Sequence, residues 1–321
     1  MEGIILKLNK INVLKAFAIV QAIIILVMFL FIIWFCFIRN SGLAIMAGKP
    51  QERTRPIIEK EETFYQYDGR KIILHDSTLG ETFIPVYSDV PASNLNPDSF
   101  IKNANGFVSY SGTEIQNTAT GVDISEHQGI IDWEQVKNAG IDFAMIRIGY
   151  RTYGGGLITI DSNYSANIEG ALNAGLDVGV YFFSQAVNTD EAVEEADALL
   201  DAIYGYDITY PVVFDWELIF DDHARTDDVG VETLADCCVA FCERVKSAGY
   251  KPMIYQNTTT ATHKLDLPRV KDYDFWLAEY GSRPSFYYKY DMWQYSNSGT
   301  VPGIEGSCDL NICFKDYSAE Q

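Results

Sequence analysis

Basic residues and histidines are scarce in this chain of 321 residues. The sequence holds 24 Lys and Arg against 44 Asp and Glu, with 4 His, for a formal net charge of −20. Residues 1–60 carry 8 Lys and Arg against 3 Asp and Glu, so the acidic excess lies entirely after residue 60. Because nucleic-acid binding needs a basic surface, an acidic body of this size argues against nucleic acid as a partner.

Cysteines and histidines are also too few and too scattered for several kinds of site. Six Cys occur, and those outside the apolar N-terminal run are odd in number, so they form no complete disulfide framework. Cys308 and Cys313 could close a short loop, although buried free thiols are the default.

No Cys-x-x-Cys or His cluster indicates zinc, and His127 near Asp123 lacks further ligands at suitable spacing. The serines have no positioned His for a Ser-His-Asp site. We expect no metal and no cofactor.

One long apolar run lies near the N-terminus. Residues 16–38 contain a single polar side chain, Gln21, and a helix of about 20 apolar residues spans a membrane. Lysines precede the run and only Arg39 closely follows it, so the positive-inside rule places residues 1–15 in the cytoplasm. A cleavable signal peptide is the alternative, but its apolar core has only about 7–15 residues. We therefore expect a single-pass protein of the cell membrane, with 39–62 as a linker to an extracellular domain.

A short region of extended character precedes the main domain. Residues 65–75 predict a hairpin that turns at Asp68-Gly69, a dipeptide typical of such turns. Residues 83–87 form a second short extended run. We expect 63–118 to be a small β-containing segment, which either packs on the main domain or reaches away from it.

Residues 119–317 have the rhythm of alternating strands and helices. Three segments end in an Ala-Gly pair, and an apolar run follows each of them. Glycine commonly caps the end of a helix, so this pattern predicts helices followed by strands. Asp132 and Thr189 stand where helices begin, with oxygens suited to capping. A parallel connection needs about a dozen residues, usually with a helix, and the last connections are too short for one. We therefore predict an α/β fold, an irregular TIM-like (β/α)5(β)3 barrel with some of the last strands antiparallel. The strands are expected near 121–125, 143–149, 177–184, 211–217, 251–257, 274–280, 291–296 and 309–314.

Acidic residues stand at the ends of these predicted strands. The run from Pro211 to Leu218 is a buried strand that leads into Asp215 and Glu217, whose side chains alternate onto the same side. Buried carboxylates are costly without a task or partners. Glycoside hydrolysis uses such pairs, while salt-bridged carboxylates that cap the next loop are the alternative. Acids at the first, fourth and eighth strands converge on one rim, because closure brings the first strand beside the eighth.

Aromatic and amide side chains gather at the same rim. Sugar rings present apolar faces that stack on aromatic rings, while sugar hydroxyls bond to amides and carboxylates; about half of the rim aromatics are expected to be core residues instead. Trp216 lies between the two carboxylates, so its side chain points away from them. The expected substrate-binding residues are Asp123, Asp309, Tyr181, Gln294, Trp276 and Tyr280.

Five motifs in register then resemble a known family. They are Gly121-Val-Asp-Ile-Ser-Glu-His-Gln-Gly129 with Ile131-Asp-Trp133, Phe143-Ala-Met-Ile-Arg-Ile-Gly149, Gly179-Val-Tyr-Phe-Phe-Ser184, Asp215-Trp-Glu217 and Asp309-Leu-Asn311. In this order they resemble the glycoside hydrolase family 25 lysozymes, over roughly 121–314. The resemblance implies an irregular barrel of five βα units and three further strands, and hydrolysis of the β-1,4 bond between N-acetylmuramic acid and N-acetylglucosamine in bacterial peptidoglycan.

The resemblance also implies roles for the site residues. Glu217 takes the position of the general acid, and Asp215 stabilises charge at the sugar by orienting the substrate's own 2-acetamido group. Asp123 and Asp309 match acidic residues that bind substrate or tune the pair. Neighbouring carboxylates should raise the pKa of Glu217, as an acid that works near neutrality requires.

Two other functions remain open. Family 18 chitinases also end a barrel strand in Asp-x-Glu, but they carry a further acid two residues earlier, where this chain has Val213. A non-catalytic barrel that holds glycan strands is the other alternative, and loss of Glu217 or Asp215 would have favoured it. Many family 25 lysozymes carry wall-binding repeats, which this sequence lacks, so we expect an enzyme tethered to the membrane for remodelling of the cell wall.

Overall fold

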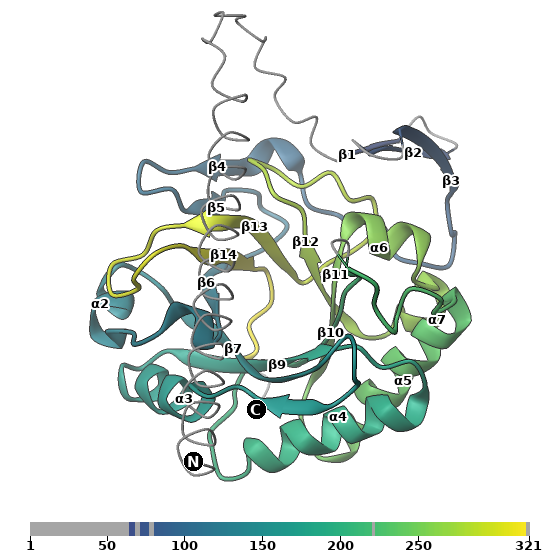
Figure 1. Cartoon of the computed structure of the whole chain (residues 1–321). Helices are drawn as coiled ribbons and strands as arrows, with labels where there is room; N and C mark the ends of the chain where they lie inside the picture. The colour runs from purple at the N-terminus through teal and green to yellow at the C-terminus, as the bar shows by residue number, and fades with distance from the viewer. Residues whose placement is uncertain (1–63, 68–70, 77–79, 220–221, 319–321) are drawn as a thin grey trace, which may run out of the picture. The chain divides into compact units, whose positions relative to one another are not determined.

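The computed structural model describes residues 64–67, 71–76, 80–219 and 222–318 (Figure 1). The chain divides into two units, 1–58 and 59–321, and every described residue belongs to the second unit. The expected cytoplasmic stretch, membrane helix and linker (1–15, 16–38 and 39–62) lie outside the described residues. The predicted boundary between 63–118 and 119–317 falls inside the second unit and stays a prediction.

The prediction of a single-pass protein of the cell membrane is corrected. Among the residues that the structure describes, no helix is long and apolar enough to cross a membrane. The longest of these helices, α5 (Val231–Ser247), has 17 residues and carries Glu232 in its first turn and Lys246 in its last. A span needs about 20 predominantly apolar residues. The stretch 16–38, on which the prediction depended, lies outside the described residues.

Eight strands close into a barrel, as predicted (Figure 1). In order around it they are β6 (Ala119–Ile124), β7 (Phe143–Arg151), β9 (Asp177–Ser184), β10 (Val212–Trp216), β11 (Pro252–Asn257), β12 (Asp274–Ala278), β13 (Met292–Gly299) and β14 (Cys308–Cys313). A short strand, β8 (Ile158–Ile160), pairs with the end of β7. Pairing of β14 with β6 closes the ring.

Helices connect the first six barrel strands, and the last connections have none. The helices are α2 (Trp133–Asn138), α3 (Tyr164–Asn173), α4 (Thr189–Ala202), α5, α6 (Thr258–His263) and α7 (Leu267–Val270), with a 3-10 turn η2 (Glu126–Gln128) after β6. Strands β12 and β13 pair in parallel although no helix lies between them. Only β14, among the barrel strands, runs antiparallel to both of its neighbours. The predicted five βα units and three further strands are confirmed.

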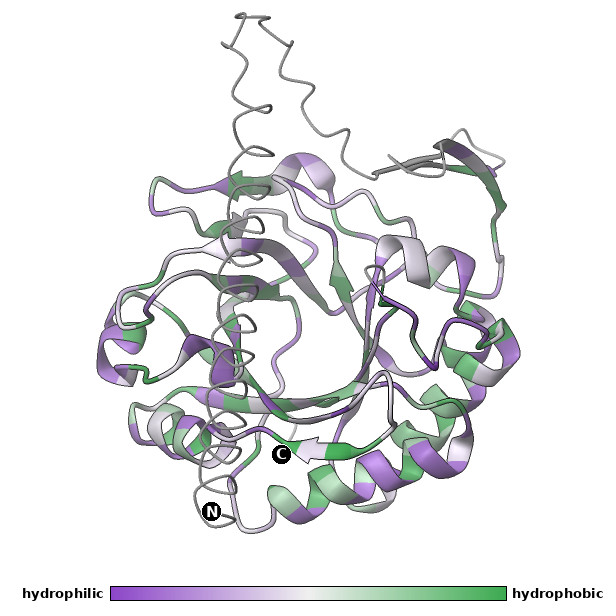
Figure 2. Cartoon of the chain, in the orientation of Figure 1, coloured by the Kyte–Doolittle hydropathy of each residue, from purple (hydrophilic) through white to green (hydrophobic). Residues whose placement is uncertain are grey.

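Side-chain alternation divides the core of the barrel domain into two parts. Along β10, Val213 belongs to a cluster inside the barrel, whereas Phe214 and Trp216 belong to the cluster between the barrel and the helices. Phe214 packs on Phe241 of α5 with ring centroids 5.0 Å apart. Figure 2 shows α4 and α5 with alternating hydrophobic and hydrophilic residues, as expected for helices with one buried face. Trp216 thus points outward, away from the carboxylates, as its position predicted.

Helix ends follow the predicted capping with one exception. Asp132 caps α2 by accepting a hydrogen bond from the backbone of Gln135. Helix α4 begins at Thr189, and its cap is the preceding residue, Asn188, whose side chain accepts from the backbone N–H of Glu191. The prediction of Thr189 as the cap was therefore wrong by one residue, because Asn is at least as good a capping residue as Thr.

The cysteines that the structure describes are buried free thiols. Cys237, Cys238 and Cys242 lie on the buried face of α5. Cys308 and Cys313 stand at the two ends of strand β14. A strand rises about 3.3 Å per residue, and a disulfide needs Cα atoms within about 7 Å, so these two residues cannot pair.

Residues 80–111 supply part of the barrel's outer cover. Strands β1 (Phe64–Tyr67), β2 (Lys71–Asp76) and β3 (Gly80–Pro85) form an antiparallel sheet, and the predicted hairpin joins the first two. A second hairpin, β4 (Phe100–Lys102) and β5 (Val108–Tyr110), follows the 3-10 turn η1 (Pro97–Ser99). The Phe100 ring lies 5.1 Å from that of Trp293 and 5.9 Å from that of Phe314. The hairpin therefore covers strands β13 and β14, where no helix lies.

We expect Phe100→Ala to destabilise the barrel. Phe100 is partly buried, so the loss should be roughly 2 kcal/mol, below the about 3–5 kcal/mol of a fully buried Phe. Thermal unfolding should shift down by about 2–4 °C for each kcal/mol in a domain of this size. Ile101, the next residue, is 48% exposed, and Ile101→Ala is the control that should change little. Equal shifts for the two variants would show that the hairpin does not support the barrel.

Candidate active site

A cavity of about 110 Å³ opens at the carboxyl ends of the parallel strands. Strand ends of an α/β barrel point their side chains into such a site. Residues from all eight barrel strands, together with Glu217 just beyond β10, line it: Asp123, Arg147, Tyr181, Phe183, Asp215, Glu217, Tyr255, Trp276, Gln294 and Asp309. Five of the predicted substrate-binding residues and both predicted catalytic residues are in this set.

Asp215 and Glu217 form the first carboxyl pair. They lie at alternate positions at the end of β10, on the same side as the inward-facing Val213. The two carboxyl groups hydrogen-bond to each other. Asp215 is buried at 5% exposure, and its Oδ1 has no hydrogen-bond partner among the protein atoms. A buried carboxylate oxygen without a partner is unusual, and it suits a group that a substrate will contact.

Asp123 and Asp309 form the second carboxyl pair. Strand β14 runs antiparallel to β6, and its register places Asp309 opposite Asp123. Asp309 therefore reaches the rim from near the start of its strand. The Asp123 Oδ2 accepts hydrogen bonds from Asn311 Nδ2 at 2.8 Å and from Gln294 Nε2 at 2.9 Å. The same Gln294 nitrogen donates to Asp309 Oδ2 at 3.2 Å and so links the two carboxyls.

Gln294 is the centre of this hydrogen-bond network. Its Oε1 accepts from the hydroxyls of Tyr255 at 3.0 Å and Tyr280 at 3.1 Å. Its Nε2 donates hydrogen bonds to Asp123 and Asp309. An amide has two donor hydrogens and two acceptor positions, so Gln294 is fully used within the protein. It forms cavity wall and holds Asp123 and Asp309 in place.

Two of the predicted aromatic residues line the cavity, and a third lies beside it. Trp276 donates its Nε1–H to Asn311 Oδ1 at 2.9 Å, and its ring lies edge-on to Tyr255 and Tyr181 at 4.9 and 6.2 Å. Tyr280 is not among the lining residues, but it is bonded to Gln294 and is 43% exposed. A ring with this exposure offers a face on which a sugar can stack.

Other rim aromatics serve the core instead. Trp216 and Trp293 are fully buried, and their indole N–H groups donate to the backbone carbonyls of Ala186 and Glu279. The Tyr295 hydroxyl accepts from the backbone N–H of Val108. Trp216, Trp293 and Tyr295 therefore belong to the core rather than to the substrate site.

Arg147 lines the cavity, and the sequence reasoning did not assign it to the site. It donates from Nε to Asp161 Oδ2 at 2.9 Å and from Nη2 to Glu126 Oε1 at 3.3 Å. It stands on β7 at the same parity as Met145 and Phe143, which point into the barrel. A charged residue at an inward position of an otherwise apolar strand was the signal that could have identified it.

The site raises the pKa of its carboxyl groups. Burial and the negative charge of Asp123 raise the pKa of Glu217 to about 7 and that of Asp309 to about 8. Burial, with the charges of Glu217 and Asp123, raises the pKa of Asp215 well above its ordinary value, which Arg147 partly offsets. Burial also raises the pKa of Asp123, against the hydrogen bonds from Asn311 and Gln294. Near neutrality these groups therefore hold more protons than exposed carboxyl groups do.

Metal ligands are not grouped in the part of the chain that the structure describes: no set of three or more His, Cys, Asp and Glu is placed to hold a metal ion. The four site carboxyls are instead engaged with amides and with one another. What the arrangement offers chemically is a half-buried proton donor, Glu217, next to the buried carboxyl group of Asp215, in a cavity walled by aromatic rings. This is the arrangement of a glycosidase that uses acid catalysis.

Comparison with known proteins agrees with that class. The profile of "Glycosyl hydrolases family 25" matches residues 122–304. An autolytic lysozyme of Clostridium acetobutylicum is 31% identical over 192 residues, which are 60% of this chain and 54% of that protein. Lysozyme M1 of Streptomyces globisporus is 29% identical over 202 residues, 60% of this chain and 66% of that protein. The chain belongs to glycosyl hydrolase family 25, and by family it is a glycoside hydrolase.

Solved structures share the fold. The bacterial lysozyme of Streptomyces coelicolor is 26% identical with a TM-score of 0.53, over 64% of this chain and 95% of that one. The modular autolysin LytC of Streptococcus pneumoniae, in complex with a synthetic peptidoglycan ligand, has a TM-score of 0.56 at 21% identity, over 78% of this chain and 57% of that one. The second likeness concerns the fold alone. This chain spans about half the length of the autolytic lysozyme and about two thirds of lysozyme M1.

The raised pKa values predict that stability falls as pH rises. In the folded protein Asp309 has a pKa of about 8 and Glu217 a pKa of about 7. In the unfolded chain, carboxyl groups have pKa values of about 4. Between these values the folded state binds more protons than the unfolded state, so the free energy of unfolding decreases with pH. We expect the melting temperature to decline from pH 5 to pH 8, and Asp309→Asn to flatten that decline.

Thermal unfolding at several pH values measures the effect. Asp228 is an exposed aspartate outside the cavity, so Asp228→Asn is the control that should keep the parental slope. Asp309→Asn should be more stable than the parent at pH 8 and nearly equal to it at pH 5. Parallel curves for parent and Asp309→Asn would contradict the assignment of the slope to this carboxyl.

Proposed function

We propose that the chain is an N-acetylmuramidase, which hydrolyses the β-1,4 bond between N-acetylmuramic acid and N-acetylglucosamine in peptidoglycan. The observation that carries this proposal is the Asp215–Glu217 pair: a half-buried carboxyl with a pKa of about 7, next to a buried carboxyl oxygen without a partner. Membership of family 25 and the similarity to an autolytic lysozyme support it.

In the proposed mechanism, Glu217 is the general acid. Its pKa near 7 keeps it protonated in a useful fraction at neutral pH, and an acid is most effective when its pKa lies near the working pH. Glu217 donates its proton to the glycosidic oxygen as the bond to the muramic acid carbon breaks. Once deprotonated, the same carboxylate accepts a proton from the water that completes hydrolysis.

Asp215 is proposed to act through the substrate. Retaining enzymes with a protein nucleophile hold their two carboxyls about 5–5.5 Å apart, and inverting enzymes hold them farther apart. Here the two carboxyl groups interact directly, through a hydrogen bond and through their charges. This favours a role in which Asp215 accepts the N–H of the 2-acetamido group, whose oxygen then attacks the sugar carbon. Its partnerless Oδ1 supplies the acceptor.

The remaining residues are proposed to bind the glycan. Asp123 and Asp309 face the same cavity, and the pKa of Asp309, raised to about 8, allows it to donate to a sugar oxygen while Asp123 accepts. Tyr181 and Trp276 contribute the cavity wall, and Tyr280 offers an exposed ring beside it. Gln294 contributes by orienting the two aspartates.

We expect Glu217→Gln to lose nearly all activity on purified peptidoglycan. The substitution keeps the shape of the side chain but removes the transferable proton, and general acid catalysis contributes about 10²–10⁴-fold to rate. Mass spectrometry of the new reducing ends is the measurement, with Asp228→Asn as an active control. The parent should release muramic acid ends. Glucosamine ends would place the cut at the other bond, and glycan binding without any product would favour a non-catalytic module.

Tyr280→Ala tests the exposed aromatic ring. Removing a stacking surface should raise KM for peptidoglycan fragments, with a smaller effect on kcat, because Tyr280 is absent from the cavity that holds the carboxyls. Tyr280→Phe keeps the ring and removes the hydroxyl bonded to Gln294, so it should retain most of the affinity. A KM that is unchanged in Tyr280→Ala would exclude stacking on this residue.

A further inference from the structure

Strand β10 loses its backbone partners just before Glu217. Its pairing with β11 ends at Asp215 opposite Tyr255, and its pairing with β9 ends at Trp216 opposite Ser184. The backbone carbonyls of Trp216 and Glu217 therefore lie at and beyond the end of the sheet. Buried carbonyl groups need hydrogen-bond donors, and a reacting carboxyl needs a backbone that holds still.

Two buried glutamines supply these donors. Gln185 Nε2 donates to the carbonyl oxygen of Glu217 at 2.7 Å, and Gln256 Nε2 donates to that of Trp216 at 2.7 Å. Both glutamines are fully buried. Gln185 directly follows β9 and Gln256 lies on β11, so they flank β10 on its two sides. Their side-chain amides thus continue the hydrogen bonding of the sheet past the point where the backbone ladder stops.

Gln185 also fixes the far end of the loop that follows Glu217. Its Oε1 accepts from the hydroxyl of Thr226 at 2.9 Å, and Thr226 is fully buried. Its backbone carbonyl accepts from Arg225 Nη1 at 3.2 Å. One side chain therefore ties together the first residue after β10 and a residue shortly before α5. Glu217 and Thr226 thus share the same amide as a hydrogen-bond partner.

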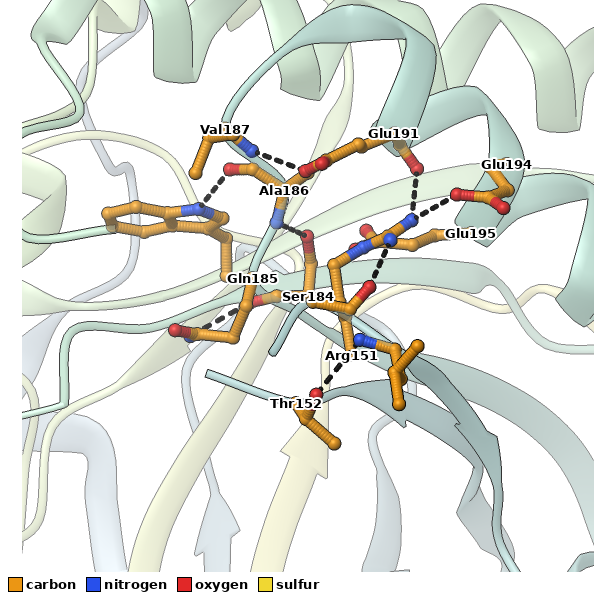
Figure 3. Close-up of polar contacts among 12 residues, drawn as sticks. Arg151, Thr152, Ser184, Gln185, Ala186, Val187, Glu191, Glu194 and Glu195 are labelled. Carbon is orange, nitrogen blue, oxygen red and sulfur yellow. Dashed lines mark hydrogen bonds and ion pairs between the residues drawn. The ribbon is translucent and has the colours of Figure 1, made fainter. Parts of the chain in front are cut away.

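Several contacts hold the segment that carries Gln185, and Figure 3 shows those of Ala186 and Val187. The carboxylate of Glu191 in α4 accepts from both terminal nitrogens of Arg225, at 2.6 and 2.9 Å, and from the backbone N–H of Val187 at 3.0 Å. The carbonyl of Ala186 accepts from the indole of Trp216 at 3.0 Å. A charge-assisted, two-pronged Arg–carboxylate contact restricts geometry more than a single bond does. Gln185 is thus pre-organised before any substrate arrives.

We propose that Gln185 is a positioning residue for Glu217, and that Gln256 assists it through the carbonyl of Trp216. Gln185 lies outside the residues that line the cavity, so it acts through the backbone of Glu217 and touches no substrate. The inference rests on the proposed function, because it assigns Gln185 a part in the reaction of Glu217. It also predicts a change in the titration of Glu217 that needs no activity to be observed.

The test uses Gln185→Leu in the full chain. Leucine fills a similar volume but offers neither donor nor acceptor, so the carbonyl of Glu217 and the hydroxyl of Thr226 lose their shared partner. A displacement of about 1 Å at a reacting group costs about 10²-fold in rate. We expect kcat on soluble peptidoglycan fragments to fall by about this factor, while KM stays near the parental value. Thr226→Val, which removes one of the amide's partners, should show a smaller loss in the same direction.

A second readout follows the carboxyl itself. The Glu217 signal is titrated by NMR in protein with ¹³C-labelled glutamate and assigned by its loss in Glu217→Gln. In the parent the pKa of Glu217 is raised to about 7 by burial and by Asp123. In Gln185→Leu we expect this pKa to move down toward its ordinary value, because a carboxyl that is no longer fixed turns toward water. This measurement also decides the inference if the parent shows no hydrolytic activity.

Ile168→Ala is the control for general destabilisation. Ile168 is a fully buried residue of α3, a helix that packs on β7 and β9. The variant should lower the melting temperature at least as much as Gln185→Leu, yet keep kcat and the Glu217 titration when assayed well below that temperature. If Gln185→Leu loses no more activity than Ile168→Ala and its Glu217 titrates as in the parent, the inference is overturned. An inactive parent whose Glu217 titration does shift in Gln185→Leu would reject the proposed function alone.

Gln185→Glu provides a conservative rescue. The carboxyl that this substitution introduces donates an O–H to the Glu217 carbonyl when it is protonated, whereas its ionised form offers only acceptors. The kcat of this variant relative to the parent, measured at each pH, should therefore improve as pH falls. A ratio that does not change with pH would contradict a role for the donated hydrogen bond.

Discussion

The rest of the site depends on the cost of keeping four carboxyl groups close together away from water. Charges of like sign at such distances cannot all persist, so the groups pair and share protons. Each pair is held in a different way: Asp123 accepts from the amides of Asn311 and Gln294, and the backbone carbonyl of Glu217 accepts from the amide of Gln185. The four groups also reduce stability at high pH, which is a common cost of a site built for reaction.

Two topological features bring these groups together. Parallel strands place Asp123, Asp215 and Gln294 at one rim because all of their strands end there. Strand β14 runs the other way, so an acid that is to meet Asp123 must stand near its start, as Asp309 does. In a fully regular barrel the eighth strand would be parallel, and it would contribute a site residue from its end. Here the antiparallel β14 contributes Asp309 from near its start.

Much of this could be predicted from the sequence. The strands, the inward parity of Asp215 and Glu217 and the outward Trp216 follow from alternation, which is local and strict. Arg147 was missed although its inward position on β7 could be read from the sequence; its ion pairs with Asp161 and Glu126 could not be foreseen. The full use of the Gln294 amide could not be foreseen either, since it depends on the hydroxyls of Tyr255 on β11 and of Tyr280 just beyond β12. Similarly, nothing in the sequence around Gln185 predicts that its amide donates to the carbonyl of Glu217. Periodicity predicts which face a side chain takes, whereas hydrogen-bond partners distant in sequence depend on the closed fold.

The course of β14 also determines where the described chain leaves the barrel. Cys313 pairs with Ala119 at the beginning of β6, and Tyr317 then packs on Tyr210 with ring centroids 5.4 Å apart and bonds to Asp274. The chain therefore enters β6 and leaves β14 at the end of the barrel opposite the cavity, where the rings of Tyr210 and Tyr317 pack together. A protein attached to a solid support through this end would present its cavity outward, so the geometry is well suited to immobilised use on insoluble substrates.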